Sequence, residues 1–110
     1  KIEYRHHTSD VDFLDTSIEH IYPENANSNH WIEKIELKDV KNIGNLTLLD
    51  RGLNSEVGNK KYTEKKKIIL EKTNLLDTKE IFTKNDDWKV SKIVDRKNSL
   101  ITVLYDEIWN

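Results

Sequence analysis

The segment SIEHIYP, residues 17–23, alternates apolar and polar side chains until Pro23 ends the alternation. Such alternation predicts a half-buried β-strand, and we expect the strand to end near Tyr22 because proline cannot continue the ladder. After Gly44, the segment NLTLL at residues 45–49 predicts a second short strand. The segment DRG at residues 50–52 then predicts a turn.

The composition of residues 54–73 predicts a helix whose N-cap is Asn54 or Ser55. Gly58 weakens the start of that helix by about 1 kcal/mol relative to alanine, so a kink or a later start is an alternative. A short helix is expected at residues 30–37. A last helix is expected from Asp86 or Asp87 to Trp109. It would carry one apolar face, formed by Val90, Ile93, Val94, Leu100, Ile101, Leu104 and Ile108.

The composition indicates one domain over residues 1–110, with 35% hydrophobic and 35% charged residues. The three Trp and four Tyr can supply a thin core, because each aromatic side chain buries a large area. The first residue, Lys1, suggests a domain excised from a longer protein. No apolar run approaches a membrane span and the first residues show no signal-peptide pattern, so we expect a cytoplasmic protein without a membrane partner.

Cysteine is absent, which excludes disulfides, thiolate catalysis and cysteine-bound zinc. The net charge of −2 argues against a strongly basic nucleic-acid binder. Residues 60–72 nevertheless hold six basic and two acidic groups, a net charge of +4. This segment is expected to make any contact with phosphate, although a solvated helix face is the usual role of such a lysine run.

Four polar residues of the predicted strand–loop–strand–helix unit suit phosphodiester hydrolysis. His20 can act as a general base, since histidine has an ordinary pKa of about 6.5. Glu19 and Asn54 offer the oxygen ligands that Mg²⁺ prefers. Asn45 would either orient His20 or pin the loop between the strands. Adjacent strand residues face opposite ways, so Glu19 is a ligand only if the strand end is distorted, and otherwise it is structural.

Other interpretations of these residues stay open. One alternative is a zinc site formed by the four histidines, His6, His7, His20 and His30, but their spacing matches no common ligand pattern. The three tryptophans, Trp31, Trp88 and Trp109, are expected in the core rather than as platforms for nucleobases. Arg96 would pair with an acid or reach a phosphate.

The sequence resembles a known family at the segments SIEHIYP and IGNLTLLDRGLNSEVGNKKYTEKK, at Trp31, and in the closing helix. It is similar to the HNH (His-Me finger, ββα-metal) nucleases, specifically to the C-terminal domain of GmrSD-type modification-dependent restriction endonucleases. The step from Asn45 to Asn54 is also similar to the asparagine spacing in the HNH domain of RNA-guided nucleases.

The resemblance implies an α+β fold, with a ββα-metal core at about residues 17–72 and a C-terminal helix at about 86–109. The core would be a short two-stranded antiparallel sheet and a helix, surrounded by further α-helices. His20 matches the general base, Glu19 and Asn54 match the metal-binding positions, and Asn45 matches the middle asparagine. Asn59 and Lys60 match the start of the finger helix. Phosphate contacts are expected from Asn59, Lys60, Lys61 and Arg51.

By the same resemblance, the protein is expected to be a Mg²⁺- or Mn²⁺-dependent DNA endonuclease of prokaryotic defence against phage, without structural zinc. Its substrate would be double-stranded DNA, modified DNA included. Its covalently linked N-terminal partner would be a sensor domain resembling a ParB-like NTPase. Two alternatives are a catalytically silent interaction domain with the same fold and an HNH-type RNase toxin.

Overall fold

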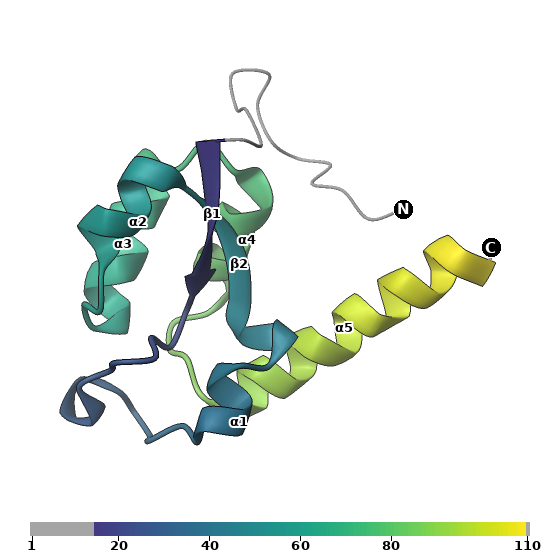
Figure 1. The fold of residues 1–110 in the computed structure, drawn as a ribbon, viewed down its shortest axis with the longest axis horizontal. Coiled ribbons are helices and arrows are strands. Elements are labelled where there is room, and N and C mark those ends of the chain that lie inside the picture. The colour runs from purple at the N-terminus through teal and green to yellow at the C-terminus, as the bar shows by residue number, and fades with distance from the viewer. Residues whose placement is uncertain (1–14, 110) are drawn as a thin grey trace.

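The computed structural model describes residues 15–109, with Ser28 and Trp109 described by their backbone alone. The predicted hairpin is present, because β1 (Thr16–His20) pairs with β2 (Leu46–Asp50) in an antiparallel sheet (Figure 1). The register is uninterrupted from Thr16 opposite Asp50 to His20 opposite Leu46. Regular pairing therefore ends at His20, before the predicted end at Tyr22.

The described chain has an α+β fold in which helices follow and surround the hairpin, and this confirms the predicted fold class. The arrangement is that of a ββα-metal core, since α2 continues directly from β2 and packs back against both strands. The α-helices are α1 (Leu37–Val40), α2 (Arg51–Val57), α3 (Tyr62–Lys72), α4 (Leu76–Lys84) and α5 (Val90–Trp109).

Several helix predictions are wrong in their bounds. Residues 31–36 form no helix but an irregular loop between a 3-10 turn at Ser28–His30 and α1. The predicted turn at residues 50–52 is instead the junction at which α2 begins. Asn54 therefore lies inside α2 and is not an N-cap.

The predicted helix at residues 54–73 is two helices, because Gly58 takes a φ of 50° and ends α2. Helix α4 was not predicted.

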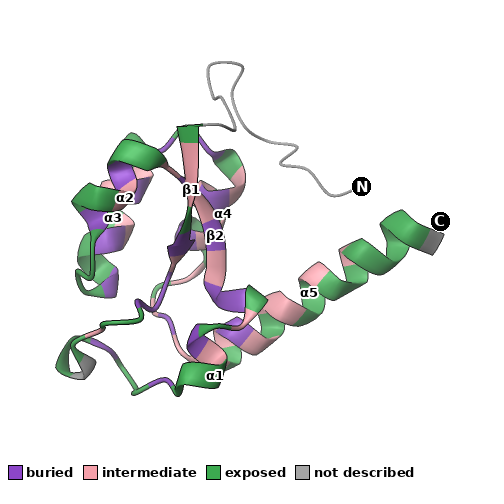
Figure 2. Ribbon diagram, viewed as in Figure 1, coloured by how far each residue is buried: buried purple, intermediate pink, exposed green. Residues whose placement is uncertain are grey.

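The core is built around a chain of aromatic rings. Ring centroids lie 4.9 Å apart between Tyr22 and Trp31, and 6.1 Å apart between Trp31 and Tyr62. Tyr62 in turn stacks on Phe82 at 5.5 Å and on Trp88 at 6.3 Å. Figure 2 shows buried positions along the sides of α2 and α3 that face the hairpin. These large rings provide a core for a chain with few apolar residues, as predicted for Trp31 and Trp88.

Helix α5 packs its first turns against the 3-10 turn Ile43–Asn45, which leads into β2. A Cβ atom at Gly44 would lie only 2.0 Å from the carbonyl oxygen of Ile93, so the contact requires glycine. Arg96 donates from Nη1 to the carbonyl oxygens of Leu46, at 2.7 Å, and Ile43, at 3.2 Å. Arg96 therefore fixes α5 to the segment that leads into β2.

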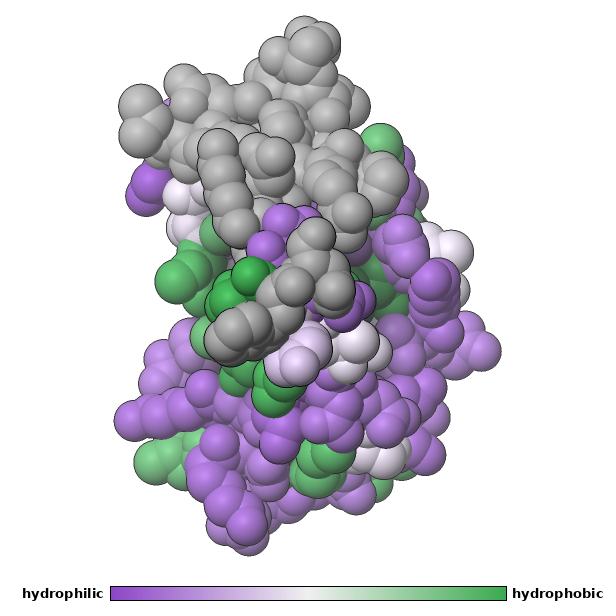
Figure 3. Space-filling model, turned by 90° about the vertical axis from the view of Figure 1, so that its right-hand side faces the viewer, coloured by the Kyte–Doolittle hydropathy of each residue, from purple (hydrophilic) through white to green (hydrophobic). Residues whose placement is uncertain are grey.

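The rest of α5 extends away from the other described elements (Figure 1). Its predicted apolar face is only partly covered, since Ile93 is buried while Ile101, Leu104 and Ile108 are exposed. On the face seen in Figure 3, hydrophilic side chains cover most of the described surface and apolar ones form separate patches. No described helix has the length and apolar character needed to cross a membrane.

Candidate active site

Glu19 projects from β1 towards α3 and is buried, with 5% of its surface exposed. Its Oε2 atom lies 2.9 Å from the Nζ atom of Lys65, a fully buried lysine of α3. The strand is regularly paired at Glu19 and His20, so these two side chains face opposite ways. The distortion predicted as the condition for Glu19 to be a ligand is therefore absent from β1, which favours its structural role as the partner of Lys65. A role in metal binding then requires a phosphate at the open end of the strand, where side chains of both faces can be reached.

The two charges of this ion pair depend on each other. Burial raises the pKa of the Glu19 carboxyl above its usual value, while the Lys65 ammonium acts against that rise. Burial also lowers the pKa of the Lys65 ammonium, and Glu19 opposes this change. Removing one partner of a buried pair costs about 3–5 kcal/mol, because the other charge stays buried and unpaired.

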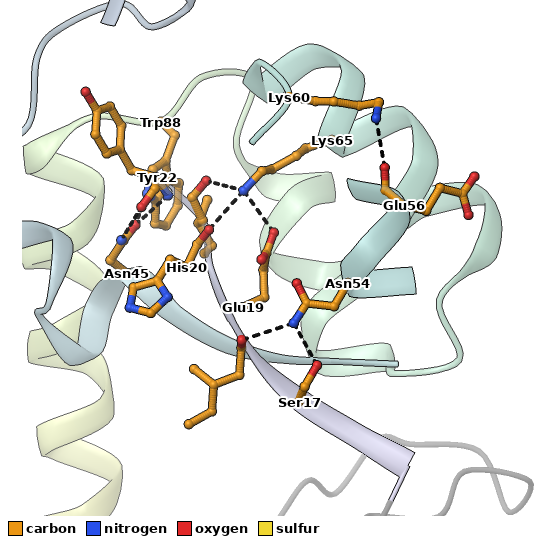
Figure 4. Close-up of polar contacts among 12 residues, drawn as sticks. Ser17, Glu19, His20, Tyr22, Asn45, Asn54, Glu56, Lys60, Lys65 and Trp88 are labelled. Atoms are coloured by element: carbon orange, nitrogen blue, oxygen red, sulfur yellow. Dashed lines mark hydrogen bonds and ion pairs between the residues drawn. The ribbon is translucent and has the colours of Figure 1, made fainter. Parts of the chain in front are cut away.

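His20 occupies the last paired position of β1 and is half-buried. Figure 4 shows its imidazole across the strand from the side chains of Glu19 and Asn54. No described residue forms a hydrogen bond with the imidazole nitrogens, although the His20 carbonyl oxygen accepts one from Lys65. The ring is therefore available to a water molecule or a substrate on its side of the strand.

Asn45 is fully buried and uses its whole amide inside the protein. Its Oδ1 atom accepts hydrogen bonds from the backbone N–H of Tyr22 and from Trp88 Nε1, both at 2.9 Å. Its Nδ2 atom donates to the carbonyl oxygens of Tyr22 and Val40, also at 2.9 Å. Of the two roles predicted for Asn45, these bonds account for the second, in which it pins the loop that follows His20.

Asn54 reaches from α2 to the first strand. Its Nδ2 atom donates to Ser17 Oγ at 2.7 Å and to the carbonyl oxygen of Ile18 at 3.2 Å. Its Oδ1 atom accepts no hydrogen bond from the described residues. In Figure 4 the Asn54 side chain lies on the same side of β1 as Glu19. The two predicted metal-binding residues thus lie on one side of β1.

The free oxygens of these two residues are of the kind that a hard divalent cation binds. Asn54 Oδ1 and Glu19 Oε1 are both oxygens without a hydrogen-bond donor among the residues that the structure describes. Mg²⁺ is commonly held by one or two protein oxygens and keeps several of its water molecules. Between residues 15 and 109 no cluster of three His, Cys, Asp or Glu side chains could hold a metal on its own. A cation here would therefore rely on water and phosphate for its other ligands.

The four predicted phosphate-binding residues are all exposed, but one of them lies apart from the other three. Arg51 donates to the carbonyl oxygen of Thr16, at the opposite end of β1 from His20. Asn59 donates to the carbonyl oxygen of Asn25, and Lys60 donates to that of Glu56. Lys61 immediately precedes α3. The structure thus places Asn59, Lys60 and Lys61 together in the α2–α3 connection and leaves Arg51 elsewhere.

Lys65 is the residue of the site that sequence reasoning missed, because it was counted within a lysine run. The spacing of Tyr62, Lys65 and Ile69 matches one face of a helix, and all three side chains are buried. The described residues give no support to the alternative of a zinc site. His30 contacts Asn27 at 3.4 Å, and His6 and His7 lie outside the described residues.

The chain was compared with protein-family models, with curated proteins and with solved structures. A family model described as "GmrSD restriction endonucleases, C-terminal domain" matches residues 1–103. No curated protein and no solved structure matches the chain. The family match covers the whole ββα unit and most of α5, so it includes every residue of the candidate site.

Proposed function

We propose that this chain, which belongs to the family of GmrSD restriction endonuclease C-terminal domains, is a metal-dependent nuclease domain acting on DNA. The family supports an endonuclease at the general level, and the proposal adds the residues and the chemistry. The observation that carries the proposal is the place where α2 packs against β1. There, Glu19 and Asn54 offer oxygens on one side of β1, and the His20 imidazole, which no described residue bonds, lies across the strand from them. The proposal therefore places the phosphate at the end of β1, in contact with both sides of the strand.

In the proposed reaction, His20 takes a proton from a water molecule while the water oxygen attacks phosphorus. The new P–O bond forms as the bond from phosphorus to the 3′ oxygen breaks, and the departing oxygen takes a proton from solvent. A bound Mg²⁺ or Mn²⁺ ion supplies stabilisation for the charge on the phosphoryl group and on the leaving oxygen. General base catalysis by a positioned histidine typically contributes about 10²–10⁴-fold to the rate.

The remaining residues of the site hold these groups in place. We propose that Glu19 Oε1 and Asn54 Oδ1 hold the cation, while Asn54 Nδ2 ties α2 to β1 through Ser17. Asn45 keeps the loop after His20 in one conformation through its bonds to Tyr22. It is therefore a positioning residue rather than a catalytic one.

The basic α2–α3 connection is the proposed contact with the DNA backbone. Asn59, Lys60 and Lys61 are exposed there, within the segment of net charge +4. The chain as a whole has a net charge of −2, so the domain by itself is expected to bind DNA weakly and without sequence preference. We propose that a linked N-terminal sensor domain, resembling a ParB-like NTPase, selects double-stranded or modified DNA in prokaryotic defence against phage.

A plasmid-nicking assay with Mg²⁺ or Mn²⁺, and with EDTA as the metal-free control, tests the proposed metal site. Asn54→Ala should lower the nicking rate at least about tenfold, since metal sites lose about 10–100-fold when even their supporting residues are removed. Asn74→Ala is the matched control, because Asn74 is exposed and lies outside the site. Equal rates for wild type and Asn54→Ala would show that Asn54 holds no essential metal.

The same assay separates the alternatives. Faster cleavage of single-stranded RNA than of plasmid would contradict the DNA assignment and favour an RNase. A folded wild-type domain that cleaves neither substrate, with either metal, would contradict a nuclease and favour a silent interaction domain.

A further inference from the structure

Lys65 is a lysine with no exposed surface in a chain whose other charged side chains lie mostly in solvent. Its Nζ atom lies 2.9 Å from each of three acceptors: Glu19 Oε2, the carbonyl oxygen of His20 and the carbonyl oxygen of Ile21 (Figure 4). An ammonium group has three N–H donors, so every donor of Lys65 is used. The lysine also lies 6.0 Å from the centroid of the Trp31 ring.

This arrangement is not explained by stability alone. Well-packed apolar residues in place of a buried ion pair are often as stable as the pair or more stable. The buried stripe of α3 already contains Tyr62 and Ile69 on either side of Lys65. An apolar residue at position 65 would complete that stripe, but it would leave two adjacent carbonyl groups and a carboxylate without their donor.

The acceptors of Lys65 belong to three consecutive residues, and the proposed general base is the middle one. Its bonds to the carbonyl oxygens of His20 and Ile21 hold the chain where the regular pairing of β1 with β2 ends. From the other side, the N–H of Ile21 donates to the carbonyl oxygen of Asn45 at 2.9 Å. The backbone that carries the His20 ring is therefore held by Lys65 and by Asn45.

The same ammonium also fixes the direction of the proposed metal ligand. Lys65 binds Glu19 through Oε2 only, and this leaves Oε1 as the oxygen for a cation. We propose that Lys65 is a positioning residue of the active site, whose buried ammonium holds the Glu19 carboxylate and the backbone of His20 in one fixed arrangement. This inference rests on the proposed function of Glu19 and His20.

The test compares Lys65→Met, which keeps the length and apolar stem of the side chain, with Lys38→Met at an exposed position of α1, outside the basic segment. Both variants are examined for fold by circular dichroism and for plasmid cleavage over a range of DNA and Mn²⁺ concentrations. Lys65→Met should lower kcat about 10–100-fold, as loss of a supporting residue does, and should leave KM for DNA within about twofold. Lys38→Met should leave both parameters within about twofold of wild type.

A second variant decides the matter if Lys65→Met does not fold. Lys65→Arg keeps the positive charge, but its planar guanidinium cannot address three acceptors that converge on a single ammonium. It should therefore slow cleavage about tenfold and shift the ¹³C resonances of the His20 and Ile21 carbonyls. A folded Lys65→Met, or failing that Lys65→Arg, with kcat within about twofold of wild type would overturn the inference.

The outcomes also separate the inference from the proposed function. If wild type does not cleave DNA, or if His20→Ala cleaves as fast as wild type, the proposed function fails and the role of Lys65 in it fails too. If wild type is active and His20→Ala is not, while the deciding Lys65 variant keeps its full rate, only the inference fails.

Discussion

Asn45 and Lys65 are buried polar side chains that hold the loop after His20 from opposite sides. The sequence identified Asn45 through its spacing to Asn54, but it left two roles open. Which role applies depends on Tyr22, Val40 and Trp88, residues whose proximity only the folded chain reveals. Lys65 was missed for the opposite reason, because its neighbours in the sequence are lysines that face solvent.

At the residue scale, Asn45→Ala should destabilise the fold by about 3 kcal/mol. The variant leaves buried groups of Tyr22, Val40 and Trp88 without partners, and each such group costs about 1–3 kcal/mol. Urea unfolding followed by circular dichroism measures the change. Asn98→Ala, at an exposed position of α5, is the control and should change stability by less than about 0.5 kcal/mol. A similarly small change for Asn45→Ala would contradict the role assigned to its four hydrogen bonds.

At the scale of the elements, both strands were predicted because alternation and Pro23 are local features. The start of α2 was not predicted, since Gly52 reads as a turn residue in sequence although it lies within a helix here. Asn54 was predicted as a ligand from its amide oxygen and from the family resemblance, but its place inside α2 follows from that missed junction. Helix α4 was missed because Thr78 and Phe82, its buried residues, give only a weak apolar pattern.

The packing of α5 against the loop before β2 leads to a prediction about two glycines. Gly44→Ala should destabilise the protein by about 3 kcal/mol or more, because the new Cβ atom would meet the Ile93 carbonyl at 2.0 Å. Gly52→Ala is the control, since nothing lies within 4 Å of the added Cβ atom there. Alanine at this helical position should raise stability by about 0.5–1 kcal/mol. Equal thermal stability of the two variants would contradict the close contact between α5 and Gly44.

For DNA binding by the whole molecule, the distribution of charge matters more than the net charge. The exposed lysines of the α2–α3 connection lie in the basic segment of an otherwise acidic chain. A domain of this kind is expected to bind DNA weakly and to depend on a linked partner for its choice of target. Composition predicted this uneven charge, but only the fold shows that Asn59, Lys60 and Lys61 share one connection while Arg51 lies at the far end of β1.

The salt dependence of DNA binding tests this surface. If Lys60 and Lys61 each contact a phosphate, the double variant Lys60→Ala/Lys61→Ala should lower the slope of log K against log salt by about 1.8, because each contact contributes about 0.9. Fluorescence anisotropy with a labelled duplex measures the slope. Lys38→Ala/Lys41→Ala removes the same charge from the exposed surface of α1 and its end, and it should leave the slope nearly unchanged. Equal slopes for the two double variants would place the DNA elsewhere.

If His20 is the general base of a metal-dependent nuclease, its replacement should slow the reaction directly. This is measured as the rate of plasmid cleavage by His20→Ala in saturating Mn²⁺. His30 is exposed, and its ring forms a hydrogen bond only with Asn27 among the described residues, so His30→Ala provides the matched control. We expect His20→Ala to cleave at least about 100-fold more slowly than wild type and His30→Ala to keep the wild-type rate. Cleavage by folded His20→Ala at the wild-type rate would contradict this role of His20.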